Sequence, residues 1–221
     1  MKRYILILIC LLITCPAYAE DDILNHYFGN NIKYYDIGFN DIEETAWAKE
    51  AILTLAKYGI VSGSDGFFCP DDSITRAQLI KIIILSFGLY DETAECVFFD
   101  VPKESWHYPF VASAKKHSVT SGITEDYFGP DEFVTREQLI TLAYNAAVKA
   151  GIVFDKKGEI HFNDIENAEP YALKAVNALA EGGIISGDQS LMLNPKNYAS
   201  RAEACKRSEE HTSELQSPNT I

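Results

Sequence analysis

Apolar side chains recur at helical spacing in three separate stretches of the chain. Within each stretch they fall three or four residues apart, which places them on one face of an α-helix. They are Trp47, Ala51, Ile52 and Leu55 in the first stretch, Trp106, Phe110 and Ala114 in the second, and Ala172, Val176 and Leu179 in the third. Thr45 and Ser105 are good N-caps for the first two helices. Gly59, Ser118 and Gly183 stand near the three helix ends, where a left-handed C-cap is expected.

A second kind of helix is expected later in each unit, and in the first two units its pattern is apolar nearly all round. Its apolar residues are Leu79, Ile80, Ile82, Ile83, Ile84 and Leu85 in one case, and Leu139, Ile140, Leu142, Ala143, Ala146 and Ala147 in the other. A helix of this kind is buried on several sides. We therefore expect the second helices to meet at the centre of the molecule, with the amphipathic helices packed outside them.

The same landmarks return three times in the same order, which predicts a repeat architecture. Each unit has a Phe-x-Asp or Phe-Asp lead-in, a glycine-containing turn, a proline loop and a Thr/Ser-Arg-x-Gln/Glu motif. Three arginines mark the period: Arg76 and Arg136 are 60 residues apart, and Arg136 and Arg201 are 65 apart. The predicted units are residues 39–98, 99–161 and 162–206, after a short lead segment at 20–38. The third unit is expected to be truncated at Lys206.

These landmarks resemble the S-layer-homology family, over roughly residues 39–206. The resemblance implies a mainly α fold in which three helix-loop-helix repeats form a pseudo-threefold spindle with a shared central helix bundle. It also implies non-covalent anchoring of an exported protein to the bacterial cell wall. The ligand implied is an anionic, often pyruvylated, secondary cell-wall polysaccharide, or modified peptidoglycan in some lineages. The chain departs from the family pattern at Pro170, which replaces a tryptophan, at Gln78 and Gln138, which replace glutamate, and at Glu137, which replaces alanine.

The motif arginines are the main candidates for ligand contact. Arg76, Arg136 and Arg201 each stand in the first helical turn, where a cation opposes the helix dipole, so a second task is expected of them. A guanidinium beside unpaired helix-start amides would form an anion site. By resemblance, Trp47 and Trp106 would pack against a sugar or pyruvyl group. The aspartates Asp41, Asp100 and Asp164 complete the lead-ins, and the first two would accept sugar hydroxyls or orient the arginines.

Each of these residues also has a structural interpretation. The motif residues Thr75, Thr135, Gln78, Gln138 and Glu203 fit a capping box, in which the hydroxyl and the Gln or Glu satisfy two helix-start amides. The tryptophans could be core residues on an apolar helix face. The aspartates could cap the first helices. Because the third unit lacks an apolar second helix, we expect the Arg201 site to be the weakest.

The charge of the chain narrows its partners. A net charge of −13 argues against nucleic acid, whose binders carry a basic face, and requires that an anionic ligand be held by a local cationic pocket. The sequence has no Gly-x-Ser-x-Gly, phosphate-loop, His-Glu-x-x-His or EF-hand motif, so we expect no catalytic residues, metal or cofactor. Two alternatives stay open. The chain could be the anchor of a larger exported enzyme, such as a glycoside hydrolase, or a structural S-layer subunit.

The two ends of the chain carry separate expectations. Residues 1–19 are typical of a signal peptide, with Lys2 and Arg3 before an apolar run and Ala17-Tyr18-Ala19 as the cleavage pattern. A lipoprotein box at Cys15 is the alternative. No transmembrane span is expected after cleavage, so the mature chain is expected to be secreted to the cell wall. Residues 207–221 resemble a translated sequencing adapter and are expected not to be native. Cys69 and Cys96 could form a disulfide or remain isolated thiols.

Overall fold

The computed structural model describes residues 38–205. This part of the chain contains six α-helices, one short 3-10 turn and no β-strand longer than an isolated bridge. The elements are α3 (Ala46–Lys57), α4 (Arg76–Ser86), α5 (Tyr108–Lys116), α6 (Arg136–Lys149), η1 (Ile165–Asn167), α7 (Pro170–Glu181) and α8 (Arg201–Cys205). The prediction of a mainly helical chain is confirmed. The expected signal peptide and the expected non-native tail lie outside the described residues.

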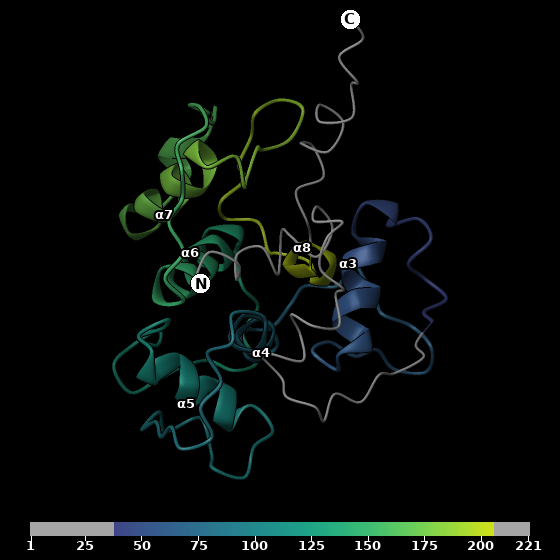
Figure 1. Cartoon of the computed structure of the whole chain (residues 1–221), viewed down its shortest axis with the longest axis vertical. Helices are drawn as coiled ribbons and strands as arrows, with labels where there is room; N and C mark the ends of the chain where they lie inside the picture. Colours follow the sequence, from purple (N-terminus) through teal and green to yellow (C-terminus); the bar gives the residue numbers. More distant parts are fainter. Residues whose placement is uncertain (1–37, 206–221) are drawn as a thin grey trace, which may run out of the picture.

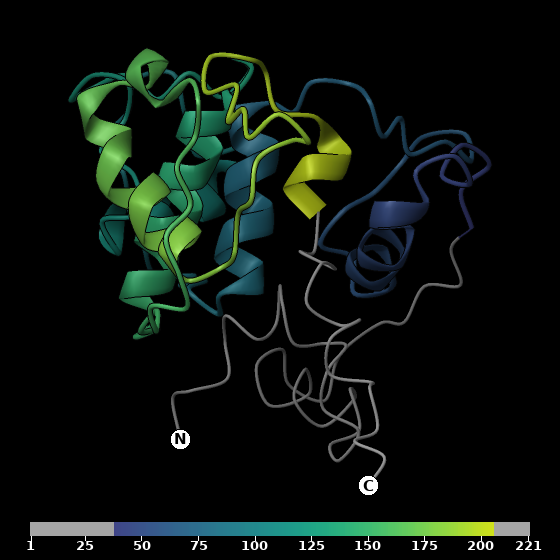
Figure 2. The ribbon, with the colours of Figure 1, turned by 90° about the horizontal axis from the view of Figure 1, so that it is seen from above.

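The most extensive helix–helix contacts run between sequence repeats. Helix α4 of the first unit packs against α5 of the second, α6 of the second packs against α7 of the third, and α8 of the third packs against α3 of the first. In Figure 1, α4, α6 and α8 lie toward the centre, and α3, α5 and α7 lie outside them. Figure 2 shows α4 and α6 side by side, and these two helices are in contact. Each unit therefore depends on its neighbours for a packing partner.

Three buried residues just before the second helices form a closed ring of backbone hydrogen bonds. The amide of Ile74 donates to Ala199 (3.0 Å), the amide of Ala199 to Val134 (2.8 Å), and the amide of Val134 to Ile74 (3.1 Å). All three side chains are almost fully buried. Because the ring takes one residue from each unit, it ties all three units together at one point.

The second helices α4 and α6 supply much of the core, as their sequence pattern predicts. In α4, Leu79, Ile80 and the run from Ile82 to Ile84 are buried. Helix α6 buries Ile140, Leu142, Ala146 and Ala147. The apolar faces predicted for the outer helices are also found, with Ile52 buried in α3 and Ala172, Val176 and Leu179 buried in α7.

Two local predictions need correction in the second unit. Helix α5 begins at Tyr108 and not after Ser105, because Ser105 and Pro102 close a turn ahead of the helix: the Ser105 hydroxyl donates to the Pro102 carbonyl (2.6 Å). Trp106 consequently lies before the helix and is 56% exposed, so the core interpretation of this tryptophan is wrong. In the lead-in, Phe98 and not Phe99 occupies the place of Phe39: its ring packs on Phe128 as that of Phe39 packs on Phe68.

The ends of the outer helices follow the prediction. Gly59, Ser118 and Gly183 all have positive φ, the conformation of a left-handed C-cap. Ser118 adopts this conformation even though it has a side chain. The cysteines Cys69, Cys96 and Cys205 are free thiols, so of the two alternatives for Cys69 and Cys96 the structure has the unpaired one.

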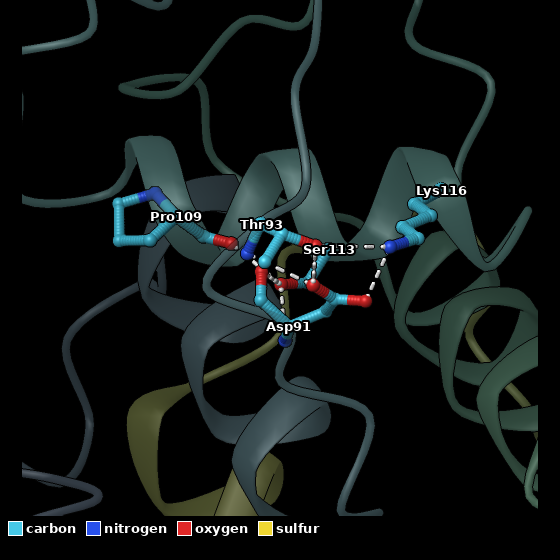
Figure 3. A network of polar contacts seen from close by, with 5 residues as sticks. All are labelled: Asp91, Thr93, Pro109, Ser113 and Lys116. Carbon is cyan, nitrogen blue, oxygen red and sulfur yellow. Dashed lines mark hydrogen bonds and ion pairs between the residues drawn. The ribbon is translucent and has the colours of Figure 1, made fainter.

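The linker between α4 and α5 is fastened to α5 by a polar network around Asp91 (Figure 3). The Asp91 carboxylate pairs with Lys116 and accepts from the amide (2.9 Å) and hydroxyl (2.6 Å) of Thr93. The Asp91 amide donates to the Ser113 hydroxyl (3.0 Å), which donates to the Pro109 carbonyl (2.7 Å). The Lys116 and Thr93 bonds lower the pKa of Asp91 to about 2.

Candidate ligand-binding site

The three motif arginines each reach into the loop of the next unit. Arg76 Nε donates to the Phe128 carbonyl (2.9 Å), Arg136 Nε to the Leu193 carbonyl (2.8 Å), and Arg201 Nε to the Phe68 carbonyl (2.9 Å). The third bond joins the last unit back to the first. We call these three places the Arg76 junction, the Arg136 junction and the Arg201 junction. The sequence predicts the arginines but not that each would work in a neighbouring unit.

The lead-in aspartates hold the same three loops from the other side. Asp41 accepts from the amides of Phe68 (2.8 Å) and Cys69 (2.7 Å). Asp100 does the same for Phe128 (2.9 Å) and Gly129 (2.6 Å), and Asp164 for Leu193 (2.7 Å) and Asn194 (2.7 Å). Desolvation raises the pKa of Asp41, but the two amide bonds and the Arg201 charge bring it below its ordinary value. Both oxygens of each carboxylate thus bind the backbone, which gives the aspartates a structural task that sequence analysis missed.

The helix-start amides are also engaged, which corrects one expectation. The amides of Arg76 and Ala77 donate to the carbonyls of Glu132 (2.9 Å) and Pro130 (3.0 Å). The amides of Arg136 and Glu137 donate to Asn197 and Pro195, and those of Arg201 and Ala202 to Asp72 and Pro70. These amides are not unpaired, because the neighbouring loop docks on them. Any anion site must therefore be built from side chains.

Two of the three predicted capping boxes form with both hydrogen bonds. The Gln78 amide oxygen accepts from the Thr75 amide (3.2 Å), and the Thr75 hydroxyl accepts from the Gln78 amide (3.4 Å). Ser200 and Glu203 make the same two bonds, at 2.9 and 3.1 Å. At Thr135 only half of the box is hydrogen-bonded, because the backbone amide donates to the Gln138 side chain (3.1 Å) but the Thr135 hydroxyl has no hydrogen-bond partner. Thr75, Thr135, Gln78, Gln138 and Glu203 therefore each lie at a helix start, and one oxygen of each Gln or Glu side chain is engaged by the backbone.

The Arg201 junction opens into a pocket of about 200 Å³. Arg201 Nη2 donates to the Ser62 carbonyl (2.9 Å), and its guanidinium lies 4.6 Å from the centre of the Phe68 ring. Ser62 is held in place by the turn at Gly63, where a β-carbon would come within 2.1 Å of the Phe67 carbonyl. The pocket combines polar groups from several elements with an apolar wall. Its lining residues are Ser62, Gln78, Lys81, Trp106 and Arg201, with Ile60, Val61, Phe68, Ile74 and Ile82.

Lys81 is a pocket residue that sequence analysis missed. Its ammonium donates to the Gly59 carbonyl (3.1 Å), and burial lowers its pKa. The signal was present in the sequence, because Lys81 is the one charged residue inside the apolar run from Leu79 to Leu85. A lysine in that position brings a second cation to the pocket.

The Arg136 junction has the same backbone frame and a different polar partner. Arg136 Nη1 forms a salt bridge with Glu203 Oε1, and both side chains are about 28–29% exposed. Leu193 stands where the other two loops have phenylalanine. The guanidinium charge is therefore balanced within the protein.

The Arg76 junction is closed by burial. Arg76 is only 5% exposed, its guanidinium lies 5.0 Å from the centre of the Phe128 ring, and burial lowers its pKa. The departure from the family pattern at Glu137, in α6, is also buried. The Glu137 carboxylate accepts from the Glu169 amide (3.0 Å), the Tyr171 hydroxyl (3.1 Å) and Lys196 (2.9 Å).

The structure brings only part of the predicted site together. Arg201, Gln78 and Trp106, one from each sequence unit, line one pocket. Trp47 is 40% exposed, so a core role is wrong for it too, and it is not among the residues that line this pocket. The Arg201 site was expected to be the weakest because α8 lacks an apolar pattern of its own, but the pocket around Arg201 is built mainly by the first unit.

Among the side chains of residues 38–205, no group of three or more His, Cys, Asp or Glu could hold a metal ion. None of the helices found there is long and apolar enough to cross a membrane.

Comparisons with known proteins agree with the repeat pattern. The S-layer homology domain matches residues 38–80, 98–140 and 161–205. An amylopullulanase from Thermoanaerobacterium thermosulfurigenes is 31% identical over 172 residues, which cover 77% of this chain and 9% of that protein. The exoglucanase XynX of Acetivibrio thermocellus is 31% identical over 76% of this chain and 16% of its own length. The S-layer protein sap of Bacillus anthracis is 29% identical over 76% of this chain and 20% of its own length.

The chain thus spans a fifth or less of each of these relatives. The three matched segments together cover more than half of the chain, and each contains one motif arginine. The match of the third segment ends four residues after Arg201, just as the others end four residues after Arg76 and Arg136. The chain therefore belongs to the S-layer homology domain family and carries three of its repeats.

Proposed function

We propose that residues 38–205 anchor an exported protein to the cell wall by binding an anionic secondary polysaccharide in the Arg201 junction. The observation that carries the proposal is the pocket itself. It holds a guanidinium and an ammonium beside an apolar wall and an exposed tryptophan, in a chain whose net charge is −13. Such a pocket fits a sugar that carries a carboxylate, for example a pyruvyl ketal.

Each group has a role in this proposal. Arg201 and Lys81 bind the carboxylate through charge-assisted hydrogen bonds, which are stronger than neutral ones. Trp106 covers one face of the sugar ring, and the apolar wall receives the methyl group of the ketal. Asp41 acts indirectly, because it holds the Phe68 loop on which the guanidinium rests.

The scaffold of the proposal is a pseudo-threefold spindle around a shared bundle of second helices. The closed hydrogen-bond ring and the cyclic pairing of helices support this arrangement. The pocket then depends on all three units, since Arg201, Gln78 and Trp106 come one from each.

What the anchor carries is a separate question. The relatives include an amylopullulanase, an exoglucanase and an S-layer protein, so both a cargo enzyme and a lattice subunit stay as alternatives. We propose no catalytic role for residues 38–205, and we place the protein at the cell surface. Reading the gene beyond this sequence distinguishes cargo from lattice, and self-assembly of the complete protein tests the lattice.

Co-sedimentation with purified cell-wall sacculi tests the binding proposal. The protein should pellet with intact walls and stay in solution once the secondary polymer has been removed. Trp106→Ala should weaken binding roughly fivefold, the loss of about 1 kcal/mol of aromatic packing. Trp47→Ala is the matched control and should bind like the unchanged protein. Equal pelleting with stripped walls would contradict the proposal.

A further inference from the structure

The residue at the third position of each second helix differs among the three junctions. Gln78 lines the pocket at Arg201 and Glu203 binds Arg136, and the order of the repeats assigns Gln138 to the Arg76 junction. Each sits in a capping box, so one of its two terminal atoms accepts from the cap amide: Gln78 from Thr75, Gln138 from Thr135 and Glu203 from Ser200. The other terminal atom is available to the junction, and its chemistry decides what the junction can bind.

At the Arg136 junction the other atom is a carboxylate oxygen. Glu203 Oε2 caps the helix, and Glu203 Oε1 binds the Arg136 guanidinium. An anionic ligand could reach Arg136 only by displacing this carboxylate, and the two negative charges would then lie close together. Glu203 thus stands where the carboxylate of a ligand would bind.

At the Arg201 junction the other atom is an amide nitrogen. Since the Gln78 oxygen must face the Thr75 amide, its NH₂ group is left for the pocket, and an NH₂ group cannot accept a bond from Arg201. Lys81 adds another donor. Among residues 38–205 no carboxylate forms a salt bridge with Arg201. Asp41 lies near enough for the Arg201 charge to lower its pKa, but both of its oxygens already accept from the amides of Phe68 and Cys69.

The Arg76 junction has a glutamine, Gln138, at the capping position, but its guanidinium is not open to solvent. Its guanidinium is buried, and Thr141 takes the position that Lys81 has in α4. The Thr141 hydroxyl donates to the Glu137 carbonyl (2.7 Å). This junction therefore lacks both access and the second cation.

We propose that residues 38–205 have a single anion-binding junction. Gln78 leaves Arg201 open to an anion, whereas Glu203 acts as an internal carboxylate that closes the Arg136 junction. The proposal rests on the proposed function, because it assumes that the ligand group is an anion. It predicts that exchanging an amide and a carboxylate at these two positions changes the number of binding sites.

Isothermal titration of the full chain with a 4,6-pyruvylated methyl hexoside tests this. The unchanged protein should bind one equivalent, and Glu203→Gln should bind two. Gln78→Glu should lose at least about tenfold in affinity, since a charge-assisted bond is replaced by repulsion. Both variants should fold, because each introduces the residue that another capping box of this chain already uses, and circular dichroism checks this.

The outcomes separate the two proposals. One site in the unchanged protein and two in Glu203→Gln support the inference. Two or three sites in the unchanged protein, or full affinity in Gln78→Glu, overturn the inference and leave wall binding intact. No binding by the unchanged protein overturns both the anionic ligand and the inference.

Discussion

The Arg201 and Arg136 junctions begin from the same motif and end with opposite chemistry. In both, a helix-start arginine donates Nε to a loop carbonyl of the next unit, and a lead-in aspartate holds that loop. One guanidinium then faces a pocket with Lys81 and Gln78, while the other binds Glu203. The comparison shows that each motif arginine has a structural role, and we propose that a neighbouring side chain decides whether its charge is left for a ligand.

Expressing one unit alone should disrupt both junctions. This change is expected to have the largest effect on folding. Residues 38–98 contain α3 and α4 but neither of their packing partners, α8 and α5. We expect this fragment to lack a cooperative unfolding transition, whereas residues 38–205 unfold in one step. Circular dichroism during thermal unfolding measures the difference. A fragment that melts cooperatively would show that the units are independent.

Leu142→Ala should damage the shared core without changing the contrast between the junctions. Leu142 is 7% exposed in α6, and deleting a buried leucine side chain costs about 2–5 kcal/mol of unfolding free energy. Below the unfolding transition, the number of ligand sites should stay the same. Chemical denaturation and titration together check this; a loss of stability below about 1 kcal/mol would mean that α6 is not central.

Paired substitutions of the two arginines should separate ligand binding from structure. Arg201→Met should weaken binding of a pyruvylated glycoside by about 10- to 100-fold, because a charge-assisted bond is lost. Arg136→Met should leave affinity unchanged but lower stability by about 1–3 kcal/mol, because Glu203 loses its partner. Calorimetry and denaturation measure the two effects, and equal losses of affinity would erase the distinction between the junctions.

The smallest expected effect is a pH dependence that involves neither junction. The folded pKa of Asp91, about 2, lies below its ordinary value of 3.8, so its pairing stabilises the fold above about pH 4 and is lost as the pH falls toward 2. Asp91→Asn should therefore be less stable than the unchanged protein at neutral pH, with the two curves converging near pH 2. Ligand affinity at neutral pH should not change. Curves that stay parallel down to pH 2 would rule out this role.

Much of the fold could be predicted from the sequence, because in each helix the capping and spacing patterns agree with the side chains that are buried. The apolar run of α4 and the spacing of Ala172, Val176 and Leu179 in α7 predicted buried faces that the structure contains. The capping boxes were likewise predicted, since they depend on residues three apart. The start of α5 was missed because Ser105 caps a turn through Pro102 and not the helix itself.

The site was harder to predict, because its residues meet only after three units close into a ring. A repeat period cannot tell whether an arginine bonds within its own unit or to the next. The motif therefore predicted Arg201, but not that residues of the first unit would line the pocket around it. The role of the aspartates was hidden for the same reason, since their partners lie 27–30 residues away along the chain.

An NMR titration of the arginine Nε–Hε resonances tests the central claim most directly. The full chain, labelled at arginine, would be titrated with the 4,6-pyruvylated methyl hexoside, and the resonances of Arg76, Arg136 and Arg201 would be assigned by substitution. The account predicts that the Arg201 resonance shifts to saturation while those of Arg136 and Arg76 stay in place. A shift of the Arg136 resonance with Arg201 unmoved, or equal shifts of all three, would contradict it.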